Sequence, residues 1–418
     1  FFSMTENPAL WYNVPLIAIK AKNDSLHHVI GIEEGASHVR LAQFFDARGN
    51  YKLAPFLEEA YRASVKNQFQ KDYIAADEKV NLLYSALEGR ILRIFPIPDA
   101  ENNKWVSYPE AIKGEGMFTG VDSLYVTNIL PLYMQTIQVA KKTKDYSKAN
   151  EVLESLVGFQ KKYGSEVLPS ENKIKAEVLY NKYDVFRNLF WMYMIAGMAM
   201  FLFVVIAIFK KHKALPVLIT VSKVVIVLLF LLHTAGLIAR WYVSGHAPWS
   251  DAYESIIYVA WATMFFGLAW GRKSDLTTAS TTFVTAMILM VAHLNWLDPS
   301  IANLQPVLDS YWLMIHVAVI VASYGPFTLG MILGLVALLL MIFTNDKNRK
   351  KLGINIEEIT IINELALTVG LVLLTIGNFL GGQWANESWG RYWGWDPKET
   401  WALISIMVYA FVIHMRLV

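Results

Sequence analysis

The residues with the clearest capacity for chemistry form a tryptophan-rich segment from Trp384 to Trp401. It reads Trp-Ala-Asn-Glu-Ser-Trp-Gly-Arg-Tyr-Trp-Gly-Trp-Asp-Pro-Lys-Glu-Thr-Trp and holds five of the fourteen tryptophans in the chain. Because long apolar runs flank it, we expect a dense aromatic surface at the mouth of a membrane helix bundle. Such a surface favours a large, flat, apolar ligand. An interfacial belt explains this density less well than it explains the scattered tryptophans near predicted membrane surfaces, which are Trp241, Trp249, Trp296 and Trp312.

Histidines provide a second set of chemically capable residues. Those within or at the edge of predicted spans are His233, His293, His316 and His414. A lone histidine there often only packs or forms a hydrogen bond, yet an ionisable group in a span is a functional candidate. His316 and the loop residue His246 are predicted near the outer face, whereas His414 lies roughly 20 Å down the last span from Trp401. Imidazoles at two depths suit a path that carries a ligand across the bilayer. Neutral imidazole is a good axial ligand for haem iron, and haem has the size and flatness that an aromatic surface favours.

Other polar residues of the tryptophan-rich segment have structural explanations. Asp396, Pro397 and Glu399 have the spacing of an N-cap, an N1 proline and an N3 glutamate, which predicts the start of the final helix. These carboxylates need not touch a ligand. Arg391 and Lys398 are the nearest cations and could pair with haem propionates or be solvated. No side chain is predicted to act as a catalytic acid or base.

Composition excludes several classes of protein. The chain is 55% hydrophobic and 17% charged, which indicates membrane spans. Lys+Arg 37 against Asp+Glu 35 leaves no basic field for nucleic acid. The chain has no cysteine, so a disulfide, a thiolate metal site or a catalytic thiol would have to come from a partner. Neither end has the features of a natural terminus, and we expect the chain to be part of a longer polypeptide.

The first half, residues 1–188, is predicted to be a soluble extracytoplasmic domain. It has no window of the roughly 18 apolar residues that a spanning helix needs. Tyr12–Ile19 is strand-like, and apolar residues at helical spacing follow in residues 53–92 and 121–159. The adjacent His27 and His28 are interpreted as a solvated loop pair rather than a metal site. We therefore expect a mixed, mostly helical domain.

The second half, residues 189–418, is predicted to be a mainly α, polytopic membrane bundle with about seven spans. The spans are Leu189–Phe209, Leu215–Ala239, Ile256–Trp270, Leu276–His293, Val317–Phe343, Ile361–Leu380 and Trp401–Leu417. Alternate loops carry the cations Lys210, Lys211, Lys213, Arg272, Lys273, Lys347, Arg349, Lys350 and Lys351, and should be cytoplasmic. The tryptophan-rich segment and residues 1–188 then face outward, to the periplasm in a bacterial inner membrane. Lys223, inside a span, is interpreted as a snorkelling or interhelical partner.

Three stretches, in order, resemble one family. Residues 389–399, Trp-Gly-Arg-Tyr-Trp-Gly-Trp-Asp-Pro-Lys-Glu, resemble the WWD signature of haem-handling proteins in cytochrome c maturation. Residues 245–255 resemble the Gly-His-x-Pro-x-Ser-x-x-Tyr-Glu-Ser segment of the CcsA (ResC) component of the cytochrome c synthase. Residues 310–317 resemble the external-histidine segment of the same component. The resemblance covers residues 189–418 and implies the later part of a CcsB–CcsA fusion.

The resemblance implies where haem would bind. The family holds haem on the outer face between two histidines that flank the WWD segment, and also within the bilayer between span histidines. By position, His316 corresponds to the first external iron ligand and His414 to a membrane ligand. The other expected haem-binding residues are His246, Trp389, Gly390, Trp393, Trp395 and Asp396. The second external ligand is expected beyond residue 418, and the partner membrane histidine in the CcsB (ResB) half.

Three functions stay open on the sequence. The first is a holocytochrome c synthase, which moves haem b outward and promotes its thioether attachment to Cys-x-x-Cys-His of an apocytochrome c. Its partners would be the apocytochrome, the CcsB half, thiol-reducing proteins and the bilayer, with no nucleic acid. The second is a haem exporter that passes haem to a chaperone without forming the bond. The third is an unrelated transporter with an aromatic gate.

Overall fold

The computed structural model describes residues 2–20, 24–33, 35–63, 66–114, 116–210, 212–294, 297–301, 304, 310–346 and 348–415. The predictions made for Lys211, Trp296 and Lys347 lie outside these residues. Contacts divide the chain into two compact units, Phe1–Leu168 and Pro169–Val418, which are described separately. This division reflects which residues pack together and does not test where the soluble part ends. The predicted border between soluble and membrane parts at residues 188 and 189 stays a prediction.

The first unit is mostly helical with two small sheets. Its helices are α1 Phe2–Glu6, α2 Pro8–Tyr12, α3 Asp24–Ile30, η1 Leu41–Phe44, α4 Ala54–Arg62, α5 Gln68–Leu87, α6 Tyr108–Lys113, α7 Gly120–Thr143 and α8 Ser147–Gly164. The antiparallel pairs are β1 Pro15–Ala18 with β2 His38–Arg40, and β3 Arg93–Pro96 with β4 Trp105–Ser107. Strand β1 lies within the predicted Tyr12–Ile19 strand. The β3–β4 pair was not predicted.

Two apolar cores hold the first unit together. One gathers Leu26, Leu41 and Phe44 around helix α5, and the other gathers Phe95 and Phe159 between the β3–β4 pair and helices α7 and α8. The expectation of a solvated histidine pair on a loop is wrong. The pair lies in helix α3, and His27 is only 1% exposed. The cause is helical spacing, because residue 27 shares the inward face of α3 with Ile30.

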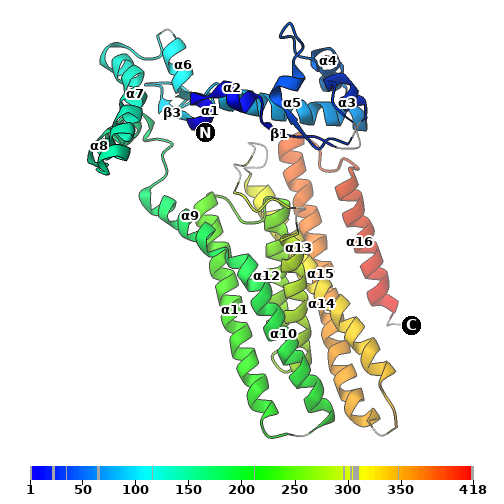
Figure 1. Ribbon diagram of the computed structural model, residues 1–418. Coiled ribbons are helices and arrows are strands. Elements are labelled where there is room, and N and C mark those ends of the chain that lie inside the picture. Colours follow the sequence, from blue (N-terminus) through cyan, green and yellow to red (C-terminus); the bar gives the residue numbers. More distant parts are fainter. Residues whose placement is uncertain are drawn as a thin grey trace. The chain divides into compact units, whose positions relative to one another are not determined.

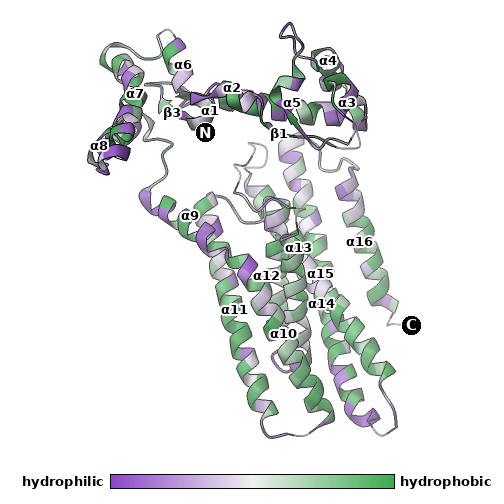
Figure 2. Ribbon diagram, viewed as in Figure 1, coloured by the Kyte–Doolittle hydropathy of each residue, from purple (hydrophilic) through white to green (hydrophobic). Residues whose placement is uncertain are grey.

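The second unit is a bundle of long helices. They are α9 Glu171–Tyr183, α10 Val185–Phe209, α11 Leu215–Ser244, α12 Ala252–Trp270, α13 Asp275–Ala292, α14 Tyr311–Ile342, α15 Arg349–Trp389 and α16 Pro397–His414. Among the described residues, six helices are long and apolar enough to cross a membrane, with α9 and α10 counted as one. Figure 1 shows these helices side by side, and Figure 2 shows their middle parts as predominantly hydrophobic. The chain is therefore a mainly α, multi-pass membrane protein.

The seventh predicted span corresponds to helix α16. Its 18 residues begin with the polar turn Pro397–Glu399, and it is not among the six qualifying helices. Residues 416–418 at the end of the predicted span lie outside the described part of the chain. The count of about seven spans thus stays a prediction.

Close packing between helices depends on small residues. A Cβ added at Gly325 of α14 would lie 2.8 Å from the backbone of Ala262 in α12. One at Gly377 of α15 would lie 2.5 Å from Ile320 of α14. In a membrane, where lipid is as apolar as leucine, such close contact of helices is a main source of stability. These glycines bring α12, α14 and α15 together at the level where the candidate site forms.

Cations lie at the bundle end that carries the 210–214 and 343–348 connections, but not all in loops. Arg349, Lys350 and Lys351 begin helix α15, which corrects the prediction that they lie in a loop. The Lys351 ammonium donates to the carbonyl of Ile208 at the C-terminal end of α10, where a helix favours positive charge. Lys223 of α11 pairs with Asp275 of α13 at 2.5 Å, which confirms its predicted role between helices.

Candidate functional site

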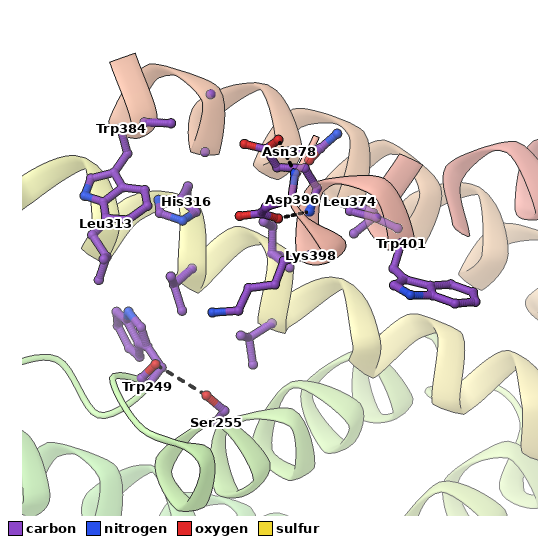
Figure 3. Close-up of a pocket in the computed structure, with 18 of the residues that line it drawn as sticks. Trp249, Ser255, Leu313, His316, Leu374, Asn378, Trp384, Asp396, Lys398 and Trp401 are labelled. Atoms are coloured by element: carbon purple, nitrogen blue, oxygen red, sulfur yellow. Dashed lines mark hydrogen bonds between the residues drawn. The ribbon is translucent and has the colours of Figure 1, made fainter. Parts of the chain in front are cut away.

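A cavity of about 740 Å³ lies where helices α12, α14, α15 and α16 meet (Figure 3). Its volume is in the range of small-molecule sites. Aliphatic side chains of α14 and α15 form part of its wall. The aromatic and polar lining includes Trp249, Asp251, His316, Asn378, Trp384, Trp393, Asp396, Lys398, Glu399 and Trp401. The described part of the chain therefore places the tryptophan-rich segment and the external histidine around one cavity.

His316 has a defined orientation and tautomer. Its Nδ1 lies 2.8 Å from the carbonyl oxygen of Trp312, one turn earlier in α14. A carbonyl can only accept, so Nδ1 carries the proton in the neutral ring and the lone pair resides on Nε2. The ring also stacks on the indole of Trp384, with centroids 5.5 Å apart and planes inclined by 29°. A histidine held in this way is prepared to bind a metal through Nε2.

Space beside His316 is kept open by a glycine. A Cβ added at Gly381 would lie 3.3 Å from Cδ2 of His316 and 3.8 Å from its Nε2. Gly381 itself lines the cavity. Any larger residue at this position would therefore crowd the imidazole on its cavity side.

Trp249 forms the wall opposite α15. It lies in the connection before α12, and its indole Nε1 donates to the carbonyl of Met314 in α14 at 3.0 Å. Its ring also contacts Tyr258 and Trp241, with centroid distances of 4.8 Å and 5.6 Å. These contacts fix an aromatic face at one side of the cavity. An interfacial belt alone would not require a hydrogen bond into the bundle.

The connection between α15 and α16 is folded back onto α15. Helix α15 ends at Gly390, whose φ of 69° is the left-handed conformation typical of a helix C-terminus. The Tyr392 hydroxyl donates to the carbonyl of Phe379 at 2.7 Å, and its ring covers Gly382, where a Cβ would lie 2.5 Å from Cε1. This contact brings the following residue, Trp393, to the cavity.

The predicted start of the last helix is confirmed. The Asp396 carboxylate accepts from the Glu399 amide at 2.8 Å, and the Glu399 carboxylate accepts from the amides of Gly394 and Asp396 at 2.8 and 3.3 Å. Both carboxylates are thus occupied by backbone amides. Lys398 follows in the same turn, and its side chain extends into the cavity (Figure 3).

The residues predicted to bind haem fall into two groups. His316, Trp393 and Asp396 line the cavity. Those outside its lining are Trp389, Gly390, Trp395, His246 and His414. The side chains of Trp389 and Trp395 are 59% and 70% exposed, and Trp395 also has a positive φ of 56°. The roles of this second group stay predictions.

Two histidines of the second group have local partners. His246 contacts the carbonyl of Ala247 through Nδ1 at 3.2 Å and lies 3.9 Å from the Glu254 carboxylate. His414 is exposed near the end of α16, and its Nδ1 lies 2.7 Å from the carbonyl of Ala410. By the argument used for His316, the Nε2 lone pair of His414 is free in the neutral ring. His414 therefore keeps the tautomer that a metal ligand needs.

Sequence reasoning missed a buried ion pair behind the cavity. The Arg240 guanidinium and the Glu254 carboxylate are 0% exposed and bonded at 2.8 Å. Arg240 also donates to the Tyr180 hydroxyl and to the carbonyls of Pro299 and Ser300. The sequence did contain a signal for this pair, because Arg240 and Glu254 are charged residues next to the ends of apolar spans. The pair joins α11, α12 and residues 297–301, and it supports the connection that carries Trp249.

The carboxylate of Asp298, in residues 297–301, is also stabilised by a local hydrogen bond. The backbone amide of Ser300 donates to Asp298 at 2.9 Å, and this bond lowers the pKa of the Asp298 carboxyl below its usual range. Asp298 therefore stays ionised near Arg240 at neutral pH.

The fold and the cavity define a class: a helical, multi-pass membrane protein with an aromatic site at one end of its bundle. Comparison with known proteins then gives the family. Residues 249–418 match the family described as "Cytochrome C assembly protein". The chain is 31% identical over 261 residues to the cytochrome c biogenesis protein CcsA of Prochlorococcus marinus (strain MIT 9301), which covers 53% of this chain and 81% of that protein. It belongs to the CcsA-type cytochrome c assembly proteins.

Another relative matches nearly the whole chain. Protein NrfI of Wolinella succinogenes is 39% identical over 416 residues, or 99% of this chain. The chain spans 45% of the length of NrfI. CcsA of Chlamydomonas reinhardtii is 36% identical over 216 residues, which are 50% of this chain and 59% of that protein. The first unit therefore has a counterpart in NrfI. The family resemblance drawn from residues 245–255, 310–317 and 389–399 is confirmed.

Proposed function

We propose that this protein binds haem b in the cavity and promotes its thioether attachment to an apocytochrome c. The observation that carries the proposal is His316, whose Nε2 lone pair is free beside Trp384 in a cavity with tryptophan walls. Imidazole is a preferred ligand of haem iron, and aromatic rings favour a flat apolar macrocycle. Membership of a cytochrome c assembly family supports the same substrate.

The residues present fit this substrate. Trp384 and Trp393 have buried indole N–H groups with no hydrogen-bond partner among the described residues. An unpaired buried donor costs about 1–3 kcal/mol, so the site gains when an acceptor enters or the indoles turn toward water. Trp249 and Trp384 would contact the ring, and His316 would bind the iron. We keep His414 as the proposed membrane ligand, and His246, Trp389, Gly390 and Trp395 as proposed contacts on the outer side.

The attachment reaction needs orientation more than acid–base chemistry. Each cysteine thiol of the Cys-x-x-Cys-His motif adds across one vinyl group: sulfur bonds to one vinyl carbon and the thiol hydrogen goes to the other. Atoms and electrons balance without an oxidant or a reductant. The protein's contribution is to hold the ring edge toward the thiols, which raises their effective concentration. The absence of cysteine from this chain prevents a competing thiol near the vinyls.

The location and partners are part of the proposal. We infer a bacterial inner membrane, with the cavity and residues 1–188 on the periplasmic side, because cations gather at the opposite ends of the spans. The partners are the apocytochrome c, a CcsB half, thiol-reducing proteins and the bilayer. The second candidate function is a haem exporter that passes haem to a chaperone. The geometry of the cavity supports the exporter and the synthase equally, and an assay for thioether-bond formation distinguishes the two functions.

The test is co-expression of the protein with an apocytochrome c that carries Cys-x-x-Cys-His. A synthase gives haem that stays on the cytochrome after acid-acetone extraction, and an apocytochrome with both cysteines replaced by alanine gives none. Haem that is bound by the protein but never attached would support the exporter. A purified protein without Soret absorption would overturn both functions.

A further inference from the structure

Lys398 is a cation that points into the cavity. It lies in the first turn of α16, and its side chain extends toward the wall formed by His316 and Trp249 (Figure 3). Its ammonium has no ion pair or hydrogen bond to any residue that the structure describes. Lys398 is exposed, and its side chain follows the cavity wall instead of extending away from it.

The carboxylates that line the cavity are engaged elsewhere. Asp396 and Glu399 accept from backbone amides at the start of α16. Asp251 accepts from the amide of Glu254 at 2.7 Å and lies 3.8 Å from the Arg240 guanidinium. Each is thus stabilised by other donors, and Lys398 keeps an unpaired charge.

The position of Lys398 is unfavourable for a cation on local grounds. The N-terminal turn of a helix carries partial positive charge and favours anions. Indole and aliphatic side chains form part of the cavity wall, and none of the polar groups in the lining forms a described bond with the ammonium. An anion brought by a ligand would offset both penalties, and a charge-assisted bond to a carboxylate is among the stronger polar contacts.

We propose that Lys398 binds one propionate carboxylate of the porphyrin and so fixes which edge of the ring faces α16. This rests on the proposed function. Arg391, the other cation of the segment, is not in the lining: its guanidinium packs over Gly394, where a Cβ would lie 3.0 Å from Cζ. Lys398 is thus the cation of the segment that lines the cavity, and one cation pairs with one propionate.

Fixing a propionate has a consequence for the reaction. Propionates and vinyls occupy different edges of the ring, so a propionate held at α16 turns the vinyl edge away from α16. Lys398 is then a positioning residue: it touches the substrate but not the reacting carbons. Loss of its charge would reduce discrimination between ring orientations more than it would reduce iron ligation by His316.

The experiment compares two ligands on the full protein purified in detergent. Ferric haem and its dimethyl ester, which lacks both propionate charges, are titrated and followed by the Soret band. The wild type is expected to prefer haem over the ester by about tenfold or more. Lys398→Met should lose most of this preference while binding the ester as the wild type does. Lys398→Arg should restore it, and Arg391→Met, the matched control, should retain it.

Three results would overturn the proposal: an unchanged preference in Lys398→Met, loss of the preference in Arg391→Met instead, or no preference in the wild type. In each of these cases, a haem Soret band that changes when His316 is replaced would leave the proposed function intact. Failure of the wild type to bind either ligand would overturn the proposed function itself, and this proposal with it. Thermal unfolding of Lys398→Met within about 2 °C of wild type confirms that the variant is folded.

Discussion

The imidazole of His316 and the indole of Trp384 stack with their centroids 5.5 Å apart, one ring from α14 and the other from α15. Together with the bond from Nδ1 to the Trp312 carbonyl, this contact fixes the imidazole on two sides. The remaining side, with Nε2, faces open space next to Gly381. This arrangement supports the proposal that His316 is an iron ligand, and it gives the first prediction.

Replacing His316 by glycine should remove the proposed iron ligand and leave a hole of imidazole size. We expect haem affinity to fall by more than about tenfold, since even contacts that only support a metal ligand contribute 10–100-fold. Added free imidazole should restore the six-coordinate spectrum. The measurement is a Soret titration, made in a His414→Ala background so that a membrane site does not dominate the signal.

The matched control is His212→Gly, because His212 is exposed in the 210–214 connection and does not line the cavity. It should change haem affinity little. Equal losses of affinity in the two variants would contradict the assignment of His316 as the outer ligand.

Gly382→Ala should displace the connection that carries Trp393. Its Cβ would meet Cε1 of Tyr392 at 2.5 Å, so the tyrosine must move and its bond to the Phe379 carbonyl is lost. We expect a loss of stability of about 1–3 kcal/mol, typical of overpacking, and weaker haem binding. Thermal unfolding in detergent and Soret titration measure the two effects.

Gly353→Ala is the control on the same helix, because a Cβ at Gly353 meets nothing within 4 Å. Alanine there should stabilise α15 by up to about 1 kcal/mol. If both variants behaved alike, the contact of Tyr392 with Gly382 would have no role in shaping the site.

Glu254→Gln should destabilise the bundle. The Arg240 guanidinium is fully buried, and neutralising Glu254 removes its nearest counterion and leaves Asp251 at 3.8 Å. We expect a cost of up to about 3–5 kcal/mol. Since Ser250 also donates to Glu254, the connection that holds Trp249 should loosen. The readouts are the unfolding temperature and the emission of the tryptophans.

An exposed glutamate of α15, Glu387, supplies the control. Glu387→Gln should shift the unfolding temperature by no more than a surface substitution does, within about 0.5 kcal/mol. A stability of Glu254→Gln equal to that of Glu387→Gln would show that the buried pair contributes nothing net.

Acid should weaken the first turn of α6. The Ser107 backbone amide and hydroxyl donate to Glu110 and lower the pKa of its carboxyl below the usual value. Because the pKa of Glu110 is lower in the folded state than in the unfolded state, its ionised carboxylate stabilises the fold above the unfolded-state pKa. This stability is lost as the pH falls through the folded-state pKa. Hydrogen exchange of residues 107–113 should therefore accelerate below about pH 4.

Glu110→Gln tests the cause. The glutamine side chain does not titrate, so exchange in this segment should lose its acid-dependent component while the amides of α8 keep theirs. An identical pH profile in wild type and variant would mean that another carboxyl controls the turn.

Helix positions and helix starts were largely predictable because they depend on local sequence. Apolar runs near 20 residues long indicated the spans, and the spacing of Asp396, Pro397 and Glu399 indicated a capped start. The structure has both, with α15 far longer than expected: the predicted span Ile361–Leu380 lies inside a helix from Arg349 to Trp389. Polar ends of long helices extend beyond the apolar run, and hydropathy does not detect them.

Which tryptophans face the cavity was not predictable. Trp384 and Trp389 are on the same helix, but five residues at about 100° each turn their side chains roughly 140° apart. One therefore stacks on His316 while the other is exposed. Composition indicates only that tryptophans are dense here, because the facing direction depends on how α15 is rotated against α14.

By itself, then, the sequence determined a multi-pass helical protein with imidazoles, a tryptophan-rich segment and a capped last helix, since each of these is a property of neighbouring residues. Only the tertiary structure decided that Lys398 rather than Arg391 enters the cavity, that His316 keeps a free Nε2, and that Arg240 pairs with Glu254. These relationships join residues of different helices or depend on side-chain direction. They exist only once α11, α12, α14, α15 and α16 have packed.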